Sequence, residues 1–503
     1  MKYFRYIAIT LLLAVVITSC EDFLTVQSPD ELTSDSFWRN KTDAEAGLAA
    51  AYSKLEASTD TWEFPEVFFP FEAYREDIIK PGADAFNYPN WIELATFTYT
   101  NGNSQFTAYW RDNYYGINYS NQVIENMPEI PANEISEQDR AMIQNEAYFL
   151  RGYYHMKLLL NWERIIIRDK YITSTNELEK ALASRSEAWD FIIDNFTKAT
   201  ALPATRTPET TGRVTKGAAY AFLGWAHLTR AYEETDKKEA QLNAALNALN
   251  QVNGYELVKE LRSLFNGNSR NSKEGIFELQ LTLNTANGAR YRLQLHRFIG
   301  CEELRGWEEI LPTDILISAY KKEGKIATTG RYDSRLYETI YLKDEYFNDE
   351  ETPRVYGRTY DYWFGGEDKP SFRKYMPELY SELTTSYFAP NIMLMRYTNV
   401  LLMKAEALNE LGRTSEAIPL INQVRARADM PPMNGTSQQA VRSQIEHERM
   451  LEFPLENMRF YDLRRWSKAK EVLHAAGRTN FDPAKNNFYP VPLQELNNNG
   501  AID

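Results

Sequence analysis

Apolar residues recur at helical spacing over much of this 503-residue chain, and the pattern is clearest in the segment 396–466. Gly412 interrupts one apolar stripe, and a second stripe follows it. Thr414 is suited to cap the second helix, and Glu416 then lies in its first turn, where the helix dipole favours negative charge. The pattern predicts a helical hairpin. Its apolar positions are Leu401, Leu402, Ala405, Leu408, Leu411, Ala417, Leu420, Ile421 and Val424.

Similar periodicity predicts further helices in the first half of the chain. Ser136–Asp139 has the pattern of a capping box that opens the longest of them. The helices follow one another with short links and recurrent Ala, Leu and Gly, as in degenerate tetratricopeptide units. We therefore expect a mainly α fold with few short strands, built on a helical-pair scaffold. The predicted helices span residues 42–57, 106–127, 136–162, 184–200, 215–233 and 237–252.

Two stretches, 62–103 and 264–390, lose the helical period and are rich in Pro, Gly and aromatic residues. In the second, Ile276–Leu281 alternates like a strand, and Thr313–Lys322 forms the only convincing helix. Long ordered loops tend to carry function. We interpret both stretches as a loop-rich, ligand-binding part of a single domain, 20–503, whose scaffold covers about 42–57, 106–252 and 396–466.

The N-terminus predicts export. Lys2 and Arg5 precede an apolar run, Ile7–Ile17, which is too short to span a membrane. Cys20 follows a small residue, as in bacterial lipoproteins, so residues 1–19 are predicted to be a signal peptide and Cys20 to be acylated. The alternative is an ordinary signal peptide with Cys20 as a free thiol. Once Cys20 is lipidated, Cys301 has no partner for a disulfide.

Composition narrows the class of partner. The formal net charge of −14 argues against nucleic acid. Aromatic residues make up 13% of the chain, with 32 Tyr and 10 Trp. That content is high for a helical protein, and rings with a polar tip suit sugars and peptides at a surface.

No catalytic motif is present, and we expect no enzyme activity. The segment His447–Leu451 lacks the second His of a zinc-protease motif, and no nucleophile elbow, P-loop or dinucleotide fingerprint occurs. A glycosidase carboxylate pair remains open, although nothing singles out two residues. No cofactor is predicted. A structural Ca²⁺ ion among the loop carboxylates is conceivable, but no loop has recognisable ligand spacing.

The charged residues between Glu448 and Arg465 allow two interpretations, anion binding or structural ion pairs. We favour the second: Arg459 and Arg464 would each pair with a carboxylate through both guanidinium nitrogens and fix how the last helices dock. Arg396 is expected to act in the same way. Pro454 should end the preceding helix near Phe453.

Sugar rings stack their C–H faces on aromatic rings, while their hydroxyls need planar polar partners. The two loop-rich stretches supply both kinds of side chain. For any single ring, packing in the core is the more common role. The predicted ligand-binding residues are Arg75, Asp77, Trp91, Trp307, Tyr360, Trp363 and Arg373.

Several blocks, in order along the chain, resemble the SusD/RagB-like nutrient-binding outer-membrane lipoproteins. They are the lipidated start Cys20–Leu24, the hairpin RYTNVLLMKAEALNELG with EAIPLINQVRARA, the charged block ERMLEFPLENMRFYDLRRW and the tail YPVPLQELNNN. Weaker agreement lies in GWEEILPTDILISAYKKEG with the later RYDSRL, and in Phe71–Asp77. The charged block departs from the family pattern at Met450, Pro454 and Asn457–Met458, which we interpret as local variation.

The resemblance implies a cell-surface protein that is anchored in the outer membrane by lipid and is not an enzyme. Such proteins capture an oligosaccharide or polysaccharide and deliver it to a SusC-like TonB-dependent transporter. The family's ligand residues vary with the ligand, so no site transfers residue by residue. The alternatives are a peptide-capturing protein of the same fold, a surface glycoside hydrolase, and a helical scaffold without a small ligand.

Overall fold

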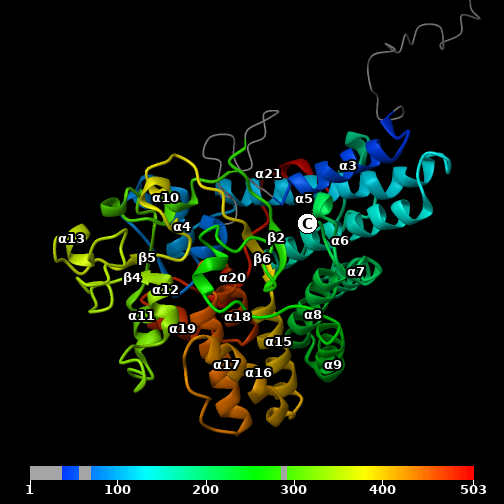
Figure 1. Cartoon of the computed structure of the whole chain (residues 1–503). Coiled ribbons are helices and arrows are strands. Elements are labelled where there is room, and N and C mark those ends of the chain that lie inside the picture. The colour runs from blue at the N-terminus through cyan, green and yellow to red at the C-terminus, as the bar shows by residue number, and fades with distance from the viewer. Residues whose placement is uncertain (1–36, 56–68, 285–291, 503) are drawn as a thin grey trace, which may run out of the picture.

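The computed structural model describes residues 37–55, 69–284 and 292–502 (Figure 1). The predicted signal peptide 1–19, the lipidation site Cys20 and the first part of the earlier loop-rich stretch, 62–68, lie outside the described residues. The described part is mainly helical, with three two-stranded antiparallel sheets. The expected fold class is therefore confirmed.

Six helices build the first half of the scaffold, and their ends follow from local sequence. Ser136 accepts a hydrogen bond from the amide of Asp139, and Ser184 and Glu187 form a complete capping box. Thr215 caps the next helix through the amide of Ala218. The helices are α3 (Lys41–Ser53), α5 (Ser104–Asn126), α6 (Glu137–Asn161), α7 (Arg185–Ala199), α8 (Lys216–Glu233) and α9 (Lys238–Leu249).

Consecutive helices pack as pairs: α5 on α6, α6 on α7, and α8 on α9, while α3 lies across α5 and α6 (Figure 1). Gly116 allows α5 to approach α6 closely, because a Cβ at this position would lie 2.4 Å from the ring of Tyr154. Tyr154 is itself anchored, since its hydroxyl donates to the carbonyl of Ala51 on α3. This arrangement has the helical-pair form that the sequence predicts.

The C-terminal hairpin consists of α15 (Tyr397–Glu410) and α16 (Thr414–Arg427), and α17 (Gln438–Glu452) packs on both. The predicted cap is wrong by one residue: Arg413 holds the N-cap position, and Thr414 is the first helical residue. Glu416 lies in the first turn, as expected, and pairs with Arg413. Helix α17 ends one residue before Phe453, as Pro454 predicts.

Three short sheets tie the loop-rich part together. The predicted strand is confirmed as β2 (Gly275–Leu279), which pairs with β6 (Ile392–Arg396), and β6 leads directly into α15. The second sheet joins β1 (Ile79–Pro81) to β3 (Ile310–Pro312), so it links the two loop-rich stretches. The third sheet pairs β4 (Ile340–Tyr341) with β5 (Ser371–Phe372).

The loop-rich part holds more helix than the sequence predicts. The expected helix is present as α11 (Asp314–Lys321). Further helices occur where we expected none, and they are too short for a periodic signal to emerge from sequence. They are α4 (Pro89–Thr96), α10 (Leu295–Ile299), α12 (Ser334–Thr339), α13 (Tyr360–Phe364) and α14 (Tyr380–Leu383). The end of the chain adds α18 (Arg459–Arg465), α19 (Ala469–Ala475), α20 (Pro483–Asn486) and α21 (Leu493–Asn498).

The charged block docks the last helices, as predicted. Arg396 is 1% exposed and pairs with Glu274, Glu452 and Glu456 at 2.9, 2.7 and 2.7 Å. Arg459 on α18 binds both carboxylate oxygens of Asp77 from the distant β1 region.

Arg464 corrects one part of that prediction. It donates to the backbone carbonyls of Leu160 and Asn487 instead of a carboxylate. Carbonyls at the end of a helix and in a coil have no hydrogen-bond partner within a helix. The long side chain of an arginine can reach them and donate hydrogen bonds to them.

Cys301 is 1% exposed, and its burial raises the pKa of the thiol to about 12. Among the described residues, no helix is both long and apolar enough to cross a membrane.

Candidate functional site

The structure places two of the predicted ligand residues, Arg75 and Asp77, inside the protein. The Arg75 guanidinium lies between the rings of Phe460 and Tyr489, 4.1 Å from each ring centre. Asp77 is 1% exposed and is held by Arg459. Both residues hold the first loop-rich stretch against the C-terminal helices. Contact of Arg75 and Asp77 with a ligand stays a prediction. Their burial argues against it.

Trp91 lies on α4, and Trp307 precedes β3 in the chain. Trp91 is 3% exposed, stacks on Tyr88 at 4.1 Å and contacts Phe298 edge-on. Trp307 is half-buried and packs against the main core. The burial of Trp91 gives this ring a packing role.

The residues predicted between 360 and 373 lie in another region, in and around α13. Tyr360 is fully buried, stacks on Phe364 and accepts a hydrogen bond from the amide of Lys369. Trp363 is half-buried and donates through Nε1 to the carbonyl of Val355. The seven predicted residues therefore do not share one cavity.

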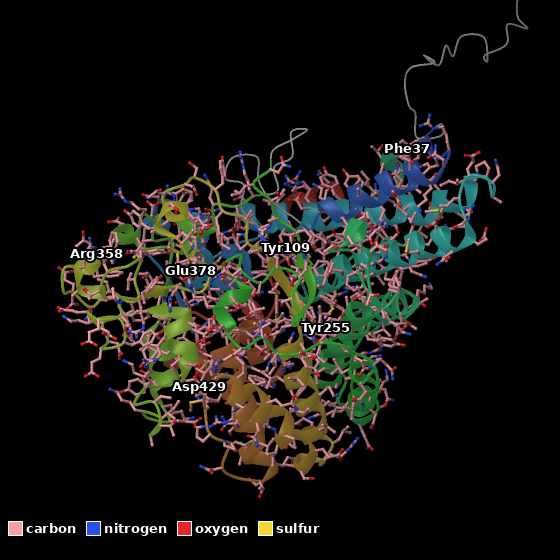
Figure 2. The ribbon with its side chains drawn as sticks, in the orientation of Figure 1. Phe37, Tyr109, Tyr255, Arg358, Glu378 and Asp429 are labelled. Carbon is pink, nitrogen blue, oxygen red and sulfur yellow. The ribbon has the colours of Figure 1, made fainter. Side chains whose placement is uncertain are left out.

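Arg373 alone among the seven lines a large cavity, of about 530 Å³, which we call the Arg373 pocket. Glu378 and Asp429, both labelled in Figure 2, stand on its wall. The volume lies within the ~300–1,000 Å³ range of small-molecule sites. The other lining residues come from the loop-rich part and from the residues just before its second stretch: Glu260, Arg262, Ser263, Asn266, Asn268, Ile326, Thr329, Arg331, Tyr332, Ser334, Tyr337, Glu338 and Tyr346.

A set of partly buried hydrogen bonds fixes one side of the pocket. Arg262 pairs with Glu378, and Asn266 donates to the same carboxylate at 3.0 Å. Burial acts to raise the pKa of Glu378, but the Arg262 charge and hydrogen bond hold it below its usual value. Burial raises the pKa of Glu338, whose carboxylate accepts from the amide of Arg262 at 2.7 Å. The wall therefore presents planar groups in defined orientations.

Tyrosines and arginines form the other side of the pocket. The ring centres of Tyr337 and Tyr346 lie 4.4 Å apart. The guanidinium carbon of Arg331 lies over the ring of Tyr346, 4.7 Å from its centre. Arg373 donates to the carbonyl of Tyr337 at 2.8 Å. Burial raises the pKa of Tyr337 to about 12. Tyr332 is half-buried and leaves part of its ring at the surface.

An aromatic ledge, formed by Tyr356, Tyr362, Trp363 and Tyr380, lies beside the pocket. Trp363 stacks on Tyr380 with ring centres 5.3 Å apart, and Tyr362 is 61% exposed. Figure 2 marks this region with the label of Arg358, whose guanidinium lies over Tyr362.

The ledge and the pocket meet at one peptide group. The carbonyl of Pro377 accepts hydrogen bonds from Tyr356 of the ledge and from Arg262 of the pocket. A ligand that extends along the protein surface could thus contact stacked rings on the ledge and planar polar groups in the pocket.

Sequence reasoning missed most of this site. Of the seven predicted residues, Arg373 lines the pocket and Trp363 belongs to the ledge. The sequence does not single out Arg262, Tyr332 or Tyr337, because no motif joins Arg262 to the two tyrosines. The segment RYDSRLY, which contains two of these tyrosines, was the available signal. Its resemblance to the family pattern does not by itself mark these tyrosines as ligand residues.

Among residues 37–55, 69–284 and 292–502, no group of three His, Cys, Asp or Glu side chains is placed to hold a metal ion. The conceivable structural Ca²⁺ site stays a prediction.

The scaffold of paired helices, with a polar pocket and exposed rings on its loops, defines a class of ligand-binding protein. Two family models match the chain in succession: "SusD family" over residues 273–503 and "Starch-binding associating with outer membrane" over residues 22–228. The chain belongs to the SusD/RagB-like family.

Relatives of the full length support this assignment. The chain is 28% identical to SusD-like protein P38 of Formosa agariphila, with 94% of each chain covered. It is 26% identical to SusD-like protein P2 of the same organism, over 100% of this chain and 99% of the relative.

Solved structures share the fold. A SusD superfamily protein from Bacteroides vulgatus aligns with a TM-score of 0.78 at 24% identity, covering 93% of this chain and 99% of the other. A structure described as a laminarin binding SusD-like protein aligns with a TM-score of 0.75 at 23% identity, with the same coverage.

Proposed function

We propose that this protein captures a glycan chain by stacking it on the aromatic ledge while the Arg373 pocket binds its hydroxyls. The observation that carries the proposal is the shared Pro377 carbonyl, which holds half-exposed rings next to a polar pocket. Sugars need both kinds of surface at once. The description of one matching family model as starch-binding, and that of one structural neighbour as laminarin-binding, support a glycan as ligand.

The proposed role is binding without catalysis. Of the four carboxylates that line the pocket, Glu378 is engaged by Arg262 and Asn266, and Glu338 by a backbone amide, while Glu260 and Asp429 are exposed. A glycosidase needs two carboxyl groups free to act on opposite sides of one bond. Release of reducing sugar by the purified protein would favour the hydrolase alternative.

Binding is tested by affinity electrophoresis and calorimetry against laminarin, starch and a panel of other polysaccharides, with oligopeptides as the alternative ligand. We expect binding to at least one glycan, and about tenfold weaker binding by Trp363→Ala. Phe86→Ala is the matched control, because Phe86 is an aromatic residue with 66% exposure that lies in the loop-rich part outside the ledge and the pocket. Binding to peptides with no binding to any glycan would refute the proposal.

The proposed location is the cell surface, with a lipid on Cys20 anchoring the chain in the outer membrane and a SusC-like TonB-dependent transporter as its partner. The family model's description supports association with the outer membrane. Cys20→Ala should move the protein from the membrane to the soluble fraction. The full-length chain should co-purify with a transporter of this type, and co-purification with none would refute the partnership.

A further inference from the structure

A second pocket lies on the helical scaffold, away from the loop-rich part. It is formed where α21, the last helix, packs along α5, as Figure 1 shows near the top of the molecule. Its volume is about 360 Å³, and we call it the α5–α21 pocket. None of its residues lines the Arg373 pocket or belongs to the ledge. They are Thr107, Trp110, Arg111, Tyr114, Tyr115, Asn118, Ile166, Arg168, Ile172, Leu178, Pro492, Gln494, Glu495, Asn498 and Asn499.

The charged groups nearest the inner side of this pocket are already engaged. Glu495 accepts a hydrogen bond from Trp110 Nε1 at 3.1 Å and one from Asn499 Nδ2 at 3.0 Å. Arg168 donates to the carbonyls of Glu177 and Leu178. Burial lowers the pKa of Arg168, and the nearby charge of Glu495 opposes that shift. A charged ligand would therefore have to compete with contacts that the protein already makes.

Aromatic rings form one wall of the pocket in a fixed orientation. The hydroxyl of Tyr114 donates to the carbonyl of Ile166 at 2.9 Å and accepts from its amide at 2.8 Å. Its ring lies 4.9 Å from that of Trp110. Tyr115 is 47% exposed at the mouth of the pocket, with its ring nearly parallel to that of Tyr119. Lys54 Nζ lies 5.2 Å from the centre of the Tyr115 ring, so a ligand would stack on the part of that ring that stays exposed. The fixed rings of Tyr114 and Trp110 lose little conformational entropy on binding.

Amide side chains on the rim have free hydrogen-bonding groups. Gln494 and Asn498 are exposed, and neither side chain makes a hydrogen bond to another described residue. Asn118 accepts from the amide of Ile172 through Oδ1, which leaves Nδ2 without a partner among the described residues. Each amide presents both donors and acceptors in one plane.

We infer that the α5–α21 pocket is a second carbohydrate site, which binds one or two neutral sugar units. Sugar C–H faces fit the rings of Tyr114 and Tyr115, and sugar hydroxyls can both donate to and accept from the rim amides. An ion would find no unpaired opposite charge on the inner side of the pocket. A purely apolar group would cover the rim amides without pairing with them, which costs free energy.

This inference goes beyond the proposed function, because it concerns a different site. Binding at two separate places on one protein would let it hold a long glycan chain at two points. Two linked contacts raise the overall affinity without any new contact, provided that the chain spans the distance between them.

The experiment uses the full-length chain in detergent, with Trp363→Ala introduced to weaken the ledge. Laminaritriose, maltotriose and cellotriose serve as neutral probes, and a trimer of galacturonic acid as the charged probe. We expect at least one neutral trimer to bind and to slow hydrogen exchange in residues 108–118 and 493–499. Failure of every neutral trimer to protect these segments would overturn the inference and leave the ledge proposal untouched.

Rim variants then test the site residue by residue. Asn498→Ala and Tyr115→Ala should each weaken the remaining binding at least fivefold. Asn497→Ala is the matched control, because Asn497 is exposed on the same helix and does not line the pocket. Equal effects of Asn497→Ala and Asn498→Ala would refute the role of the rim, as would tighter binding of the charged trimer. Circular dichroism of each variant checks that it is folded.

Discussion

The guanidinium of Arg396 lies 2.7 Å from the carboxylate of Glu452, and both side chains are almost fully buried. Arg396 stands at the end of β6 and Glu452 at the end of α17, so this pair joins the sheet of the loop-rich part to the C-terminal helices. The ion pair contributes to the stability of the fold only when both charges are present. Loss of one leaves the other buried and uncompensated.

We therefore expect Arg396→Met to lower the free energy of unfolding by about 3–5 kcal/mol. Urea denaturation followed by circular dichroism measures the change. Arg413→Met is the control, because Arg413 also pairs with a glutamate, Glu416, but at the surface. Its unfolding midpoint should not change. Similar midpoints for the two variants would contradict the structural role of Arg396.

Three buried or partly buried histidines should each contribute less stability as the pH drops below about 6.5, the ordinary pKa of histidine. Burial lowers the pKa of His155 to about 3 and those of His296 and His447 to about 4. The contacts of His155 fit a neutral ring, because Nδ1 donates to the Arg151 carbonyl while Nε2 accepts from the Arg168 amide. Between pH 6.5 and these lowered values the unfolded chain binds more protons than the folded one, so acid favours unfolding.

His155→Gln isolates one of these contributions. From about pH 6 down to pH 4, wild type should lose about 1.4 kcal/mol per pH unit relative to the variant, because one proton fewer is taken up on unfolding of the variant. Urea denaturation at pH 7, 6, 5 and 4 gives both curves. Parallel curves would show that His155 is protonated equally in the folded and unfolded states.

Gly116→Ala tests the close approach of α5 and α6. The added Cβ would lie 2.4 Å from the ring of Tyr154, which cannot swing away without breaking its hydrogen bond to Ala51. We expect a loss of about 1–3 kcal/mol in the free energy of unfolding. Gly102→Ala is the control, because its Cβ would have an ordinary contact of 3.6 Å with Thr100. If both variants unfold alike, the helices do not pack as described.

Substitution of two tryptophans should have different effects, one mainly on stability and the other mainly on glycan binding. Trp91→Ala removes a buried ring and should cost about 3–5 kcal/mol of stability. Trp363→Ala removes a half-buried ring from the ledge and should mainly weaken glycan binding. Thermal unfolding and calorimetry on the same preparations compare the two effects. A stable Trp91→Ala protein with weakened binding would place the ligand site near α4 and refute the proposed ledge.

Much of the scaffold could be predicted because its signals are local. Ser184 and Glu187 form a capping box four residues long, and the apolar stripe of α6 repeats within each turn. Pro454 ends α17 because its ring disfavours the helical conformation of the residue before it and because it has no amide hydrogen to donate. Such features depend on neighbours a few positions away, so sequence alone reveals them.

The short helices of the loop-rich part show the limit of that approach. Helix α13 spans five residues and is followed by Gly365 in a left-handed conformation. A helix of this length has little intrinsic stability and forms because its surroundings hold it. Periodicity cannot reveal it.

The sequence by itself determined the class of fold, the long helices and the structural role of most of the charged block. Only the tertiary structure decided which aromatic and polar residues share a surface. Arg75 and Trp363 occur in similar loop-rich, aromatic contexts, yet one lies between two buried rings and the other on an open ledge. The difference arises from contacts with residues more than a hundred positions away for Arg75, and such contacts leave no trace in local composition.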